Sequence, residues 1–307
     1  MTLDQLLAFQ AVATRGGFSA ASAHLHKSQP ALTKLVQNLE TELGLTLFDR
    51  AHYRATLTDA GRLFLERAEN LLARSDALHR FGRALGGAAE PVVRLVLEAV
   101  TPLPCLLGAL REVRSKFPAV RYELRSERLT GVLEALHDTS ADLVIAGRHG
   151  IDAHTMVAQA YGDVRILPVA HRDHPLAAIT GPVPAAELRQ YAQVVLTDSG
   201  RGELTQTLNV LDGGLQWTVT DVAAKLEIIE AGLGWGGLPE HIVAAAIAAG
   251  RLAALDVREF EVDALELFTI RRRDEPMGPV TQALWTRLAR RCDAAAPLPR
   301  IQRRESS

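Results

Sequence analysis

The sequence predicts an α plus α/β fold, in which a small helical domain with a β-wing, one long linker helix and a larger α/β domain follow each other. Three observations support this prediction. Apolar residues recur at helical spacing in three short stretches up to Leu43. A seven-residue apolar repeat then runs from Thr58 to about Leu85. Beyond Pro91, extended runs alternate with helical ones, and 307 residues suffice for two or three compact units.

The three short helices have recognisable ends. Residues 3–15 place apolar side chains at spacings of three and four, and a Gly-Gly pair ends this helix. Ser19 is expected to cap a short second helix. Ser28 is expected to cap the third, which accepts Pro30 in its first turn because N–H groups there have no partner within the helix.

Two short extended runs follow the third helix, which Gly44 ends. They lie around residues 45–48 and 55–57 and enclose a basic tip. Such a hairpin is a plausible β-wing. Residues 1–58 are therefore predicted to form a winged helix-turn-helix domain.

Residues 59–87 are predicted to form a linker and dimerisation helix. A seam of large and small side chains, repeated every seven residues, favours close pairing with another helix. The alternative is a helix packed on its own domain, but this helix stands between two domains instead of inside one. The seam comprises Phe64, Leu71, Leu78 and Leu85 with Ala68, Ser75 and Gly82.

The rest of the chain alternates extended and helical runs, as in a parallel sheet covered by helices. Residues 86–91, before the first of these runs, have the composition of a linker. The expected strands are 92–99, 120–125, 142–146, 165–170, 193–196, 217–220 and 266–271, and the expected helices are 104–117, 130–138, 221–231 and 280–292.

Composition and charge restrict the function classes. Apolar residues make up 48% and charged residues 23%, as in ordinary soluble globular proteins. The net charge of −2 does not suggest a nucleic-acid binder, but residues 1–87 carry ten Lys and Arg against eight Asp and Glu. A small basic lobe on an acidic body is compatible with DNA binding, because only the docking face must be positive.

Cysteine usage and hydropathy indicate the compartment. Two cysteines, Cys105 and Cys292, are too few for a disulfide scaffold, and reduced thiols are expected in preference to a redox pair. No signal peptide is visible, and the longest apolar run, residues 242–249, is too short to span a bilayer. A cytoplasmic protein without membrane contact is expected.

An ordered series of motifs carries a resemblance to a known family. The series is Phe18-Ser19-Ala20-Ala21, then Ser28-Gln29-Pro30-Ala31-Leu32-Thr33-Lys34, then Leu39–Gly44, Leu47-Phe48-Asp49-Arg50 and Leu57-Thr58-Asp59-Ala60-Gly61. It continues with His174-Pro175-Leu176 and with Glu230–Gly234 leading to Leu238-Pro239. In this order the motifs closely resemble the LysR-type transcriptional regulators, across nearly the whole chain.

The resemblance implies a DNA-binding regulator and not an enzyme. Its partners would be double-stranded promoter DNA, a small-molecule effector and other copies of itself, as a homodimer or a dimer of dimers. Contact with RNA polymerase is a further expectation, and no cofactor is implied. The C-terminal domain would resemble periplasmic solute-binding proteins, with an effector cleft between two α/β subdomains. Subdomain I would comprise residues 92–163 and 264–293, subdomain II residues 164–263, and residues 294–307 would be a flexible tail.

The polar face of the third helix has the chemistry of a recognition helix, which needs short polar groups at base edges and cations near phosphates. Gln29, Thr33 and Gln37 can hydrogen-bond to base edges. Pro30 can pack against a thymine methyl group, and Lys34 suits a phosphate or guanine. Without the resemblance, the face would be a plain solvated helix surface. The candidate DNA-binding residues, wing included, are Ser28, Gln29, Pro30, Thr33, Lys34, Gln37, Arg50 and Arg54.

The wing departs from the family pattern. Arg50 and Arg54 can reach a narrow, electronegative minor groove. Many family members carry arginine where this chain has Tyr53. Arg50 could equally be structural, tethering the wing to Glu40 or to the neighbouring Glu42.

The effector cleft is located by the rule that ligands bind beyond the carboxyl ends of parallel strands. The loop after the first strand opens a helix whose N–H groups favour an anion. Arg148 follows the third strand, where a guanidinium can hold a carboxylate. Asp198, across the hinge, points to an amine or hydroxyl on the ligand. The candidate effector-binding residues are Thr101, Pro102, Leu103, Thr130, Arg148, Thr197, Asp198 and Ser199.

Two further patterns are set aside. The glycine-rich run 232–237 resembles a dinucleotide-binding loop, but it follows a helix and leads into a strand, which is the reverse order. His171 and His174 are two of ten scattered histidines without a cysteine or carboxylate cluster of ligand spacing, so no zinc is expected.

Two alternatives remain open. An α/β enzyme or solute-binding module could carry an unrelated helical N-terminal domain. Replacing Thr33 and Lys34 with alanine would leave the function of such a protein untouched. A constitutive DNA-binding protein could also carry a vestigial cleft, and a screen for stabilising metabolites distinguishes it.

Overall fold

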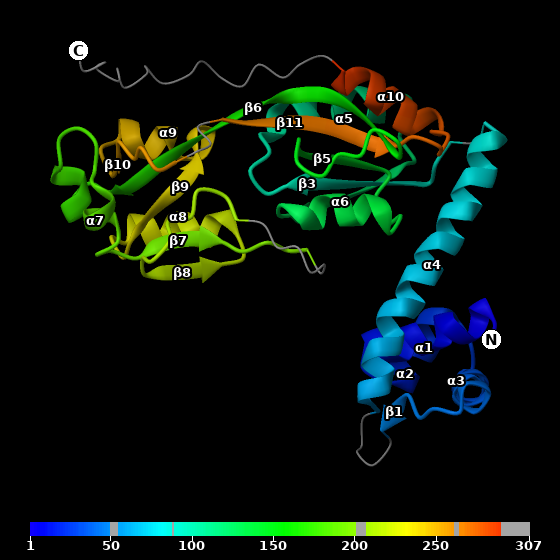
Figure 1. Ribbon diagram of the computed structural model, residues 1–307. Coiled ribbons are helices and arrows are strands. Elements are labelled where there is room, and N and C mark those ends of the chain that lie inside the picture. Colours follow the sequence, from blue (N-terminus) through cyan, green and yellow to red (C-terminus); the bar gives the residue numbers. More distant parts are fainter. Residues whose placement is uncertain (50–54, 88, 201–206, 261–263, 290–307) are drawn as a thin grey trace. The chain divides into compact units, whose positions relative to one another are not determined.

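The computed structural model describes residues 1–49, 55–87, 89–200, 207–260 and 264–289 (Figure 1). The chain divides into two compact units, Met1–Gly82 and Arg83–Ser307. The predicted fold class is confirmed, because a helix-turn-helix with a short two-stranded sheet precedes a mixed α/β sheet with helices.

The N-terminal unit is built from four helices and a small sheet. Its elements are α1 (Leu3–Arg15), α2 (Phe18–Leu25), α3 (Gln29–Leu43), β1 (Phe48–Asp49), β2 (Thr56–Leu57) and α4 (Asp59–Leu85). The core gathers one face of each helix around Phe9, whose ring lies 5.4 Å from that of Phe48 and 5.5 Å from that of Phe64. The wing and the linker helix are thus packed on the same core as the three short helices.

Helix caps explain where these helices begin. Ser28 caps α3 as expected, and its Oγ accepts a hydrogen bond from the N–H of Ala31 at 3.4 Å. The expectation for Ser19 was wrong, because α2 begins at Phe18 and the capping position belongs to Gly17. Gly17 has a φ of 143°, which a residue without a Cβ adopts at little cost.

The C-terminal unit is organised around one long sheet. Its elements are β3 (Val92–Glu98), α5 (Leu103–Lys116), β4 (Arg121–Glu127), α6 (Thr130–His137), β5 (Leu143–Gly147), β6 (Met156–His171), the 3₁₀ turn η1 (Pro175–Ala178), α7 (Ala185–Leu188), β7 (Gln193–Leu196), β8 (Gln216–Val219), α8 (Val222–Glu230), β9 (Trp235–Pro239), α9 (Glu240–Ala248), β10 (Leu252–Ala254), β11 (Ala264–Arg272) and α10 (Pro279–Leu288). The strand order is β4-β3-β5-β11-β6-β9-β7-β8, and β10 pairs with β6.

This sheet contains two parallel portions, which antiparallel strands connect. We call the part around β4-β3-β5-β11 subdomain I and the part around β9-β7-β8 subdomain II. Strand β3 runs parallel to β4 and β5, and β7 runs parallel to β8 and β9. The long strand β6 joins them, since it pairs antiparallel with β11 over one half and with β9 over the other (Figure 1).

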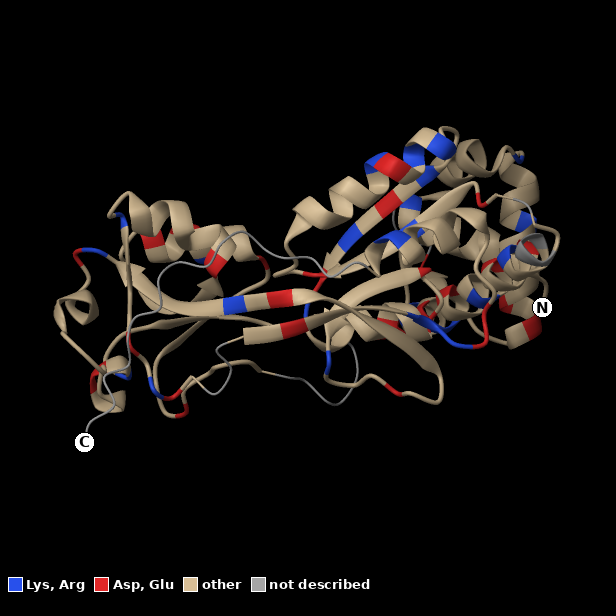
Figure 2. Cartoon of the chain, turned by 90° about the horizontal axis from the view of Figure 1, so that it is seen from above, with Lys and Arg blue, Asp and Glu red and all other residues tan. Residues whose placement is uncertain are grey.

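Strand β6 is longer than the sequence suggested. The expected strand 165–170 is only its second half, and the first half, from Met156, was missed. Gly162 and Asp163, at the predicted boundary between the subdomains, lie within this strand. The register with β11 shifts beside Gly162, where the strand holds one extra residue. Asp163 and Arg165 of β6 lie opposite Glu266 and Ala264 of β11, and charged residues mark this stretch in Figure 2.

The expectation of a reduced thiol was wrong for Cys105, which is disulfide-bonded in the structure. Cys292, the chain's other cysteine, lies outside the described residues. Cys105 lies on α5, which packs against α10, the helix that precedes Cys292 in the sequence. Spacing in the sequence cannot show such helix packing.

Candidate nucleic-acid interface and ligand pocket

Helix α3 has one buried and one exposed face. Leu32, Val36 and Leu39 are fully buried and pack into the N-terminal core. The residues between them that the sequence singled out face solvent. Ser28, Gln29, Pro30, Lys34 and Gln37 are exposed, and Thr33 is half-buried. A continuous polar face of a well-anchored helix is therefore available to a partner.

Local contacts fix the ends of this helix. The carboxylate of Glu40 accepts hydrogen bonds from the N–H groups of Leu47 at 2.8 Å and Phe48 at 3.2 Å, which holds the start of the wing against α3. Arg50 and Arg54, the candidates at the wing tip, lie outside the described residues.

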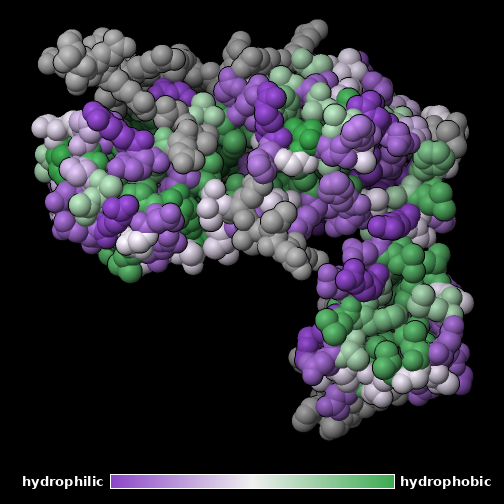
Figure 3. Space-filling view, in the orientation of Figure 1, coloured by the Kyte–Doolittle hydropathy of each residue, from purple (hydrophilic) through white to green (hydrophobic). Residues whose placement is uncertain are grey.

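The N-terminal unit also carries apolar surface on α1 and α4. Figure 3 shows green surface over these two helices. On α4, Leu63, Leu71 and Leu78 are 71%, 43% and 69% exposed, whereas Ala68 is buried. One side of α4 thus packs on the core, and another side leaves large apolar side chains uncovered within this unit.

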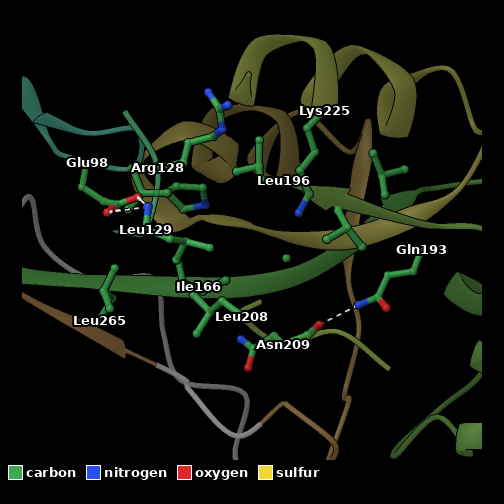
Figure 4. Close-up of a pocket in the computed structure, with 15 residues that line it drawn as sticks. Glu98, Arg128, Leu129, Ile166, Gln193, Leu196, Leu208, Asn209, Lys225 and Leu265 are labelled. Atoms are coloured by element: carbon green, nitrogen blue, oxygen red, sulfur yellow. Dashed lines mark hydrogen bonds between the residues drawn. The ribbon is translucent and has the colours of Figure 1, made fainter. Parts of the chain in front are cut away.

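A pocket of about 60 Å³ lies between subdomains I and II. Subdomain I contributes Glu98, Val100, Arg128, Leu129 and Leu265 to its walls, and subdomain II contributes residues of β7, β9 and α8 (Figure 4). Most of the wall is apolar, and its charged side chains are Glu98, Arg128 and Lys225. The position at the carboxyl end of β3 follows the rule for ligand sites in α/β sheets.

Glu98 is the buried acid of this pocket. Its side chain is 6% exposed, and both carboxylate oxygens accept the N–H of Leu129 at 3.2 Å. Burial raises the pKa of Glu98 to about 7, although hydrogen bonds from the N–H groups of Leu129 and Ala99 oppose the shift. Leu129 has a φ of 50°, a conformation that costs roughly 1–3 kcal/mol outside glycine and that marks a constrained site.

Lys225 is the buried base of the pocket. It lies on α8 and is 6% exposed, and its ammonium group forms no hydrogen bond or ion pair with the side chains of the described residues. Burial alone lowers its pKa to about 8. Its chain lies over Gly236, where an added Cβ would be 3.1 Å from Lys225 Cε and 2.6 Å from the carbonyl oxygen of Val194. Within the glycine run 232–237, the missing side chain at Gly236 thus leaves room for the backbone of Val194 and for the side chain of Lys225.

Hydrogen bonds join the two subdomains beside the pocket. Arg128 donates from Nε to the carbonyl oxygen of Thr197 at 2.6 Å and from its backbone N–H to Ser199 Oγ at 2.8 Å. Thr130 donates from Oγ1 to Asp198 Oδ2 at 2.8 Å and from its N–H to Oδ1 at 3.1 Å. The loop after β7 passes so close to the start of α6 that a Cβ on Gly200 would lie 1.9 Å from Thr130 Oγ1.

The structure brings half of the predicted effector residues together. Thr130, Thr197, Asp198 and Ser199 meet across the subdomain boundary. Thr101, Pro102 and Leu103 follow Glu98 but are not part of the pocket wall. Thr101 is buried, and its Oγ1 lacks a hydrogen-bond partner among the described residues.

Arg148 is placed away from this pocket. Its Nη2 lies 2.7 Å from Glu266 Oε2, and its guanidinium stacks 5.1 Å above the ring of Phe268. The side chain is 73% exposed. The guanidinium expected to hold a carboxylate in the cleft is therefore paired at the surface instead.

Sequence reasoning missed Glu98, Arg128 and Lys225. Two of them carry a visible signal, since each is a charge at a position where the spacing of the neighbouring apolar residues predicts burial. Glu98 ends the strand Val92–Glu98, and Lys225 stands on the side of α8 that also carries the buried Ile229. A charged residue at an apolar position is costly to bury, so it deserves a functional explanation.

Within the described residues, no helix is both long and apolar enough to cross a membrane. In the same part of the chain, no cluster of three or more His, Cys, Asp or Glu residues has the arrangement of a metal site.

Comparisons with known proteins agree with the fold. Residues 86–293 match the family model of the LysR substrate binding domain, and residues 3–62 match that of the bacterial regulatory helix-turn-helix protein, lysR family. The chain therefore belongs to the LysR family of transcriptional regulators: it is a DNA-binding regulator with a substrate-binding effector domain.

The chain is also similar to individual transcriptional regulators and to a solved structure of this family. The probable HTH-type transcriptional regulator YhaJ of Escherichia coli K12 is 31% identical over 253 residues, which are 82% of this chain and 85% of YhaJ. The transcriptional activator AllS of Klebsiella pneumoniae is 28% identical over 82% of this chain and 94% of AllS. The crystal structure of CbnR, a LysR family regulator, superposes with a TM-score of 0.61 at 20% identity, over 94% of this chain and 99% of CbnR.

Proposed function

We propose that the exposed face of α3 contacts base edges and phosphates of promoter DNA. The observation that carries this proposal is the division of α3 into a buried face, with Leu32 and Val36, and a polar one. Gln29, Thr33 and Gln37 supply hydrogen bonds to bases, and Lys34 supplies a cation. Ser28 and Pro30 lie at the same end. The structure of CbnR bound to its target DNA, with a TM-score of 0.60, supports the comparison at the level of the fold.

The wing and the linker helix complete the proposal. Arg50 and Arg54 would enter the minor groove beside the helix. The exposed Leu71 and Leu78 of α4 would pair with α4 of a second copy, because a large exposed apolar surface on a helix is stable only when it is covered. Two copies would then read two half-sites, whose spacing follows from the dimer.

The pocket between the subdomains would receive a small effector. The chain would act by binding alone, without catalysing a reaction. A ligand that changes the angle between the subdomains would change the spacing of paired DNA-binding units and, with it, contact with RNA polymerase. Of the expected residues, Thr130, Asp198 and Ser199 support this arrangement, because they already join the subdomains beside the pocket.

A mobility-shift assay on the gene's own upstream region tests the DNA contact. The wild type is expected to bind this DNA in preference to unrelated DNA at moderate salt. The Thr33→Ala/Lys34→Ala double variant is expected to lose the preference while keeping its thermal unfolding temperature. Equal binding of related and unrelated DNA by the wild type would refute the proposal.

A further inference from the structure

The most unusual charge in the C-terminal unit is the ammonium group of Lys225. Figure 4 shows it reaching from α8 into the pocket. The Lys225 residue is nine-tenths buried, and its ammonium group forms no hydrogen bond or ion pair with a described side chain. An unpaired buried ammonium destabilises a fold, because the lost hydration is not replaced. A buried ammonium group of this kind therefore indicates a site where a ligand supplies the missing partner.

The surroundings of Lys225 indicate the kind of ligand that its ammonium group would bind. The Nζ atom lies in a wall formed by β7, β9 and α8, near Val194 and Gly236. No described carboxylate pairs with it, although Glu98 belongs to the same pocket. The N–H groups of the ammonium can therefore donate to an anion in the pocket, whose charge would balance that of Lys225.

The other charged groups limit that anion to one charge. Arg128 keeps its positive charge, because its Nε donates to a neutral acceptor, the carbonyl oxygen of Thr197 at 2.6 Å, and this charge acts on the nearby Glu98. Glu98 stands in the same pocket with its carboxylate bound to the N–H of Leu129. The wall therefore holds two cations and one acid, and with Glu98 ionised its net charge is balanced by a monoanion, whereas the second charge of a dianion would be left unbalanced. Most of the remaining wall, with Ile166 and Leu196, is aliphatic and suits a short apolar body, and the amide of Gln193 is bonded to the carbonyl oxygen of Asn209.

We propose that this pocket binds a small aliphatic monocarboxylate, whose carboxylate pairs with Lys225 and whose apolar body lies against the aliphatic wall. The proposal rests on the proposed function, in which the pocket receives an effector. It moves the anion partner from Arg148, which is paired with Glu266 at the surface, to a residue of α8. The volume of about 60 Å³ favours a body of only a few carbon atoms.

The test compares matched ligands on matched variants of the full-length chain. The probes are sodium acetate, propionate, butyrate and valerate, each against its primary amide and against sodium chloride at equal ionic strength. Titration calorimetry measures Kd for the wild type, for Lys225→Met and for Lys116→Met. Lys116 lies at the end of α5 and is exposed, so its substitution removes the same charge away from the pocket.

At least one carboxylate is expected to bind the wild type and Lys116→Met equally, and its amide about tenfold or more weakly. Lys225→Met is expected to bind that carboxylate about tenfold or more weakly, while its own unfolding temperature stays equal to or above that of the wild type. The last readout excludes a merely misfolded variant, because removing an unpaired buried charge does not destabilise a fold.

Other outcomes overturn the proposal. One is carboxylate binding by Lys225→Met within twofold of the wild type, another is equal binding of amide and carboxylate, and a third is no binding of any probe. A mobility-shift assay on the same samples distinguishes failure of the monocarboxylate proposal from failure of the DNA-binding proposal. If sequence-specific DNA binding persists in all variants, the DNA-binding proposal stands even when the monocarboxylate proposal fails.

Discussion

Replacing Glu98 with glutamine is expected to change how the stability of the C-terminal unit depends on pH. Glu98 is 6% exposed, and burial raises its pKa from 4.5 to about 7. The folded protein therefore holds this proton more tightly than the unfolded chain does. The contribution of protonated Glu98 to the free energy of unfolding is fully present below pH 4.5 and is lost as the pH rises toward 7. At 1.36 kcal/mol per pKa unit, the loss amounts to about 3 kcal/mol.

Urea unfolding between pH 4.5 and pH 8 measures this loss. The three tryptophans, Trp217, Trp235 and Trp285, all lie in the C-terminal unit, so their fluorescence follows that unit within the full-length chain. The wild type is expected to lose about 3 kcal/mol relative to Glu98→Gln across this range. The exposed Glu259→Gln serves as the control and should follow the wild type. Parallel curves for the wild type and Glu98→Gln would refute the reasoning, because they would mean that Glu98 titrates alike in both states.

Three further changes have expected outcomes. Trp235→Ala removes a fully buried ring and its hydrogen bond to the carbonyl oxygen of Leu188, and it should lower the free energy of unfolding by about 3–5 kcal/mol in urea titrations. Thr130→Val deprives Asp198 of a hydroxyl donor at 2.8 Å and should cost about 1–3 kcal/mol in the same assay; no change would mean that this bond does not hold the subdomains together. Leu78→Glu places a charge on the exposed apolar surface of α4 and should weaken self-association in sedimentation velocity, whereas an unchanged oligomer would place the interface elsewhere.

The N-terminal unit could be predicted almost completely from the sequence, because its signals are local. Apolar spacing and the Ser28 cap locate α3 to within a residue. The same spacing places Lys34 and Gln37 on the solvent side. The one wrong cap, Ser19, has a local competitor in Gly17, whose φ of 143° lets α2 begin earlier.

The pocket could be predicted only in part, because it is assembled from distant segments. The rule that ligands bind beyond the carboxyl ends of parallel strands pointed to Thr130 and Asp198, which meet across the subdomain boundary. It could not show that Arg148 pairs with Glu266, since that contact joins β5 to the returning strand β11. The burial of Lys225 likewise depends on how closely β9 passes under α8, which Gly236 permits.

The salt dependence of operator binding tests the central claim most directly. Binding of full-length protein to its own upstream region is measured by fluorescence anisotropy over a range of salt concentrations, for the wild type, Lys34→Ala and Arg74→Ala. Arg74 is an exposed cation on α4, away from the recognition face. If Lys34 contacts a phosphate, Lys34→Ala lowers the slope of log K against log salt by about one per α3 engaged, and Arg74→Ala leaves it unchanged. Identical slopes and affinities for the wild type and Lys34→Ala would contradict the assignment of α3 as the DNA-contacting helix.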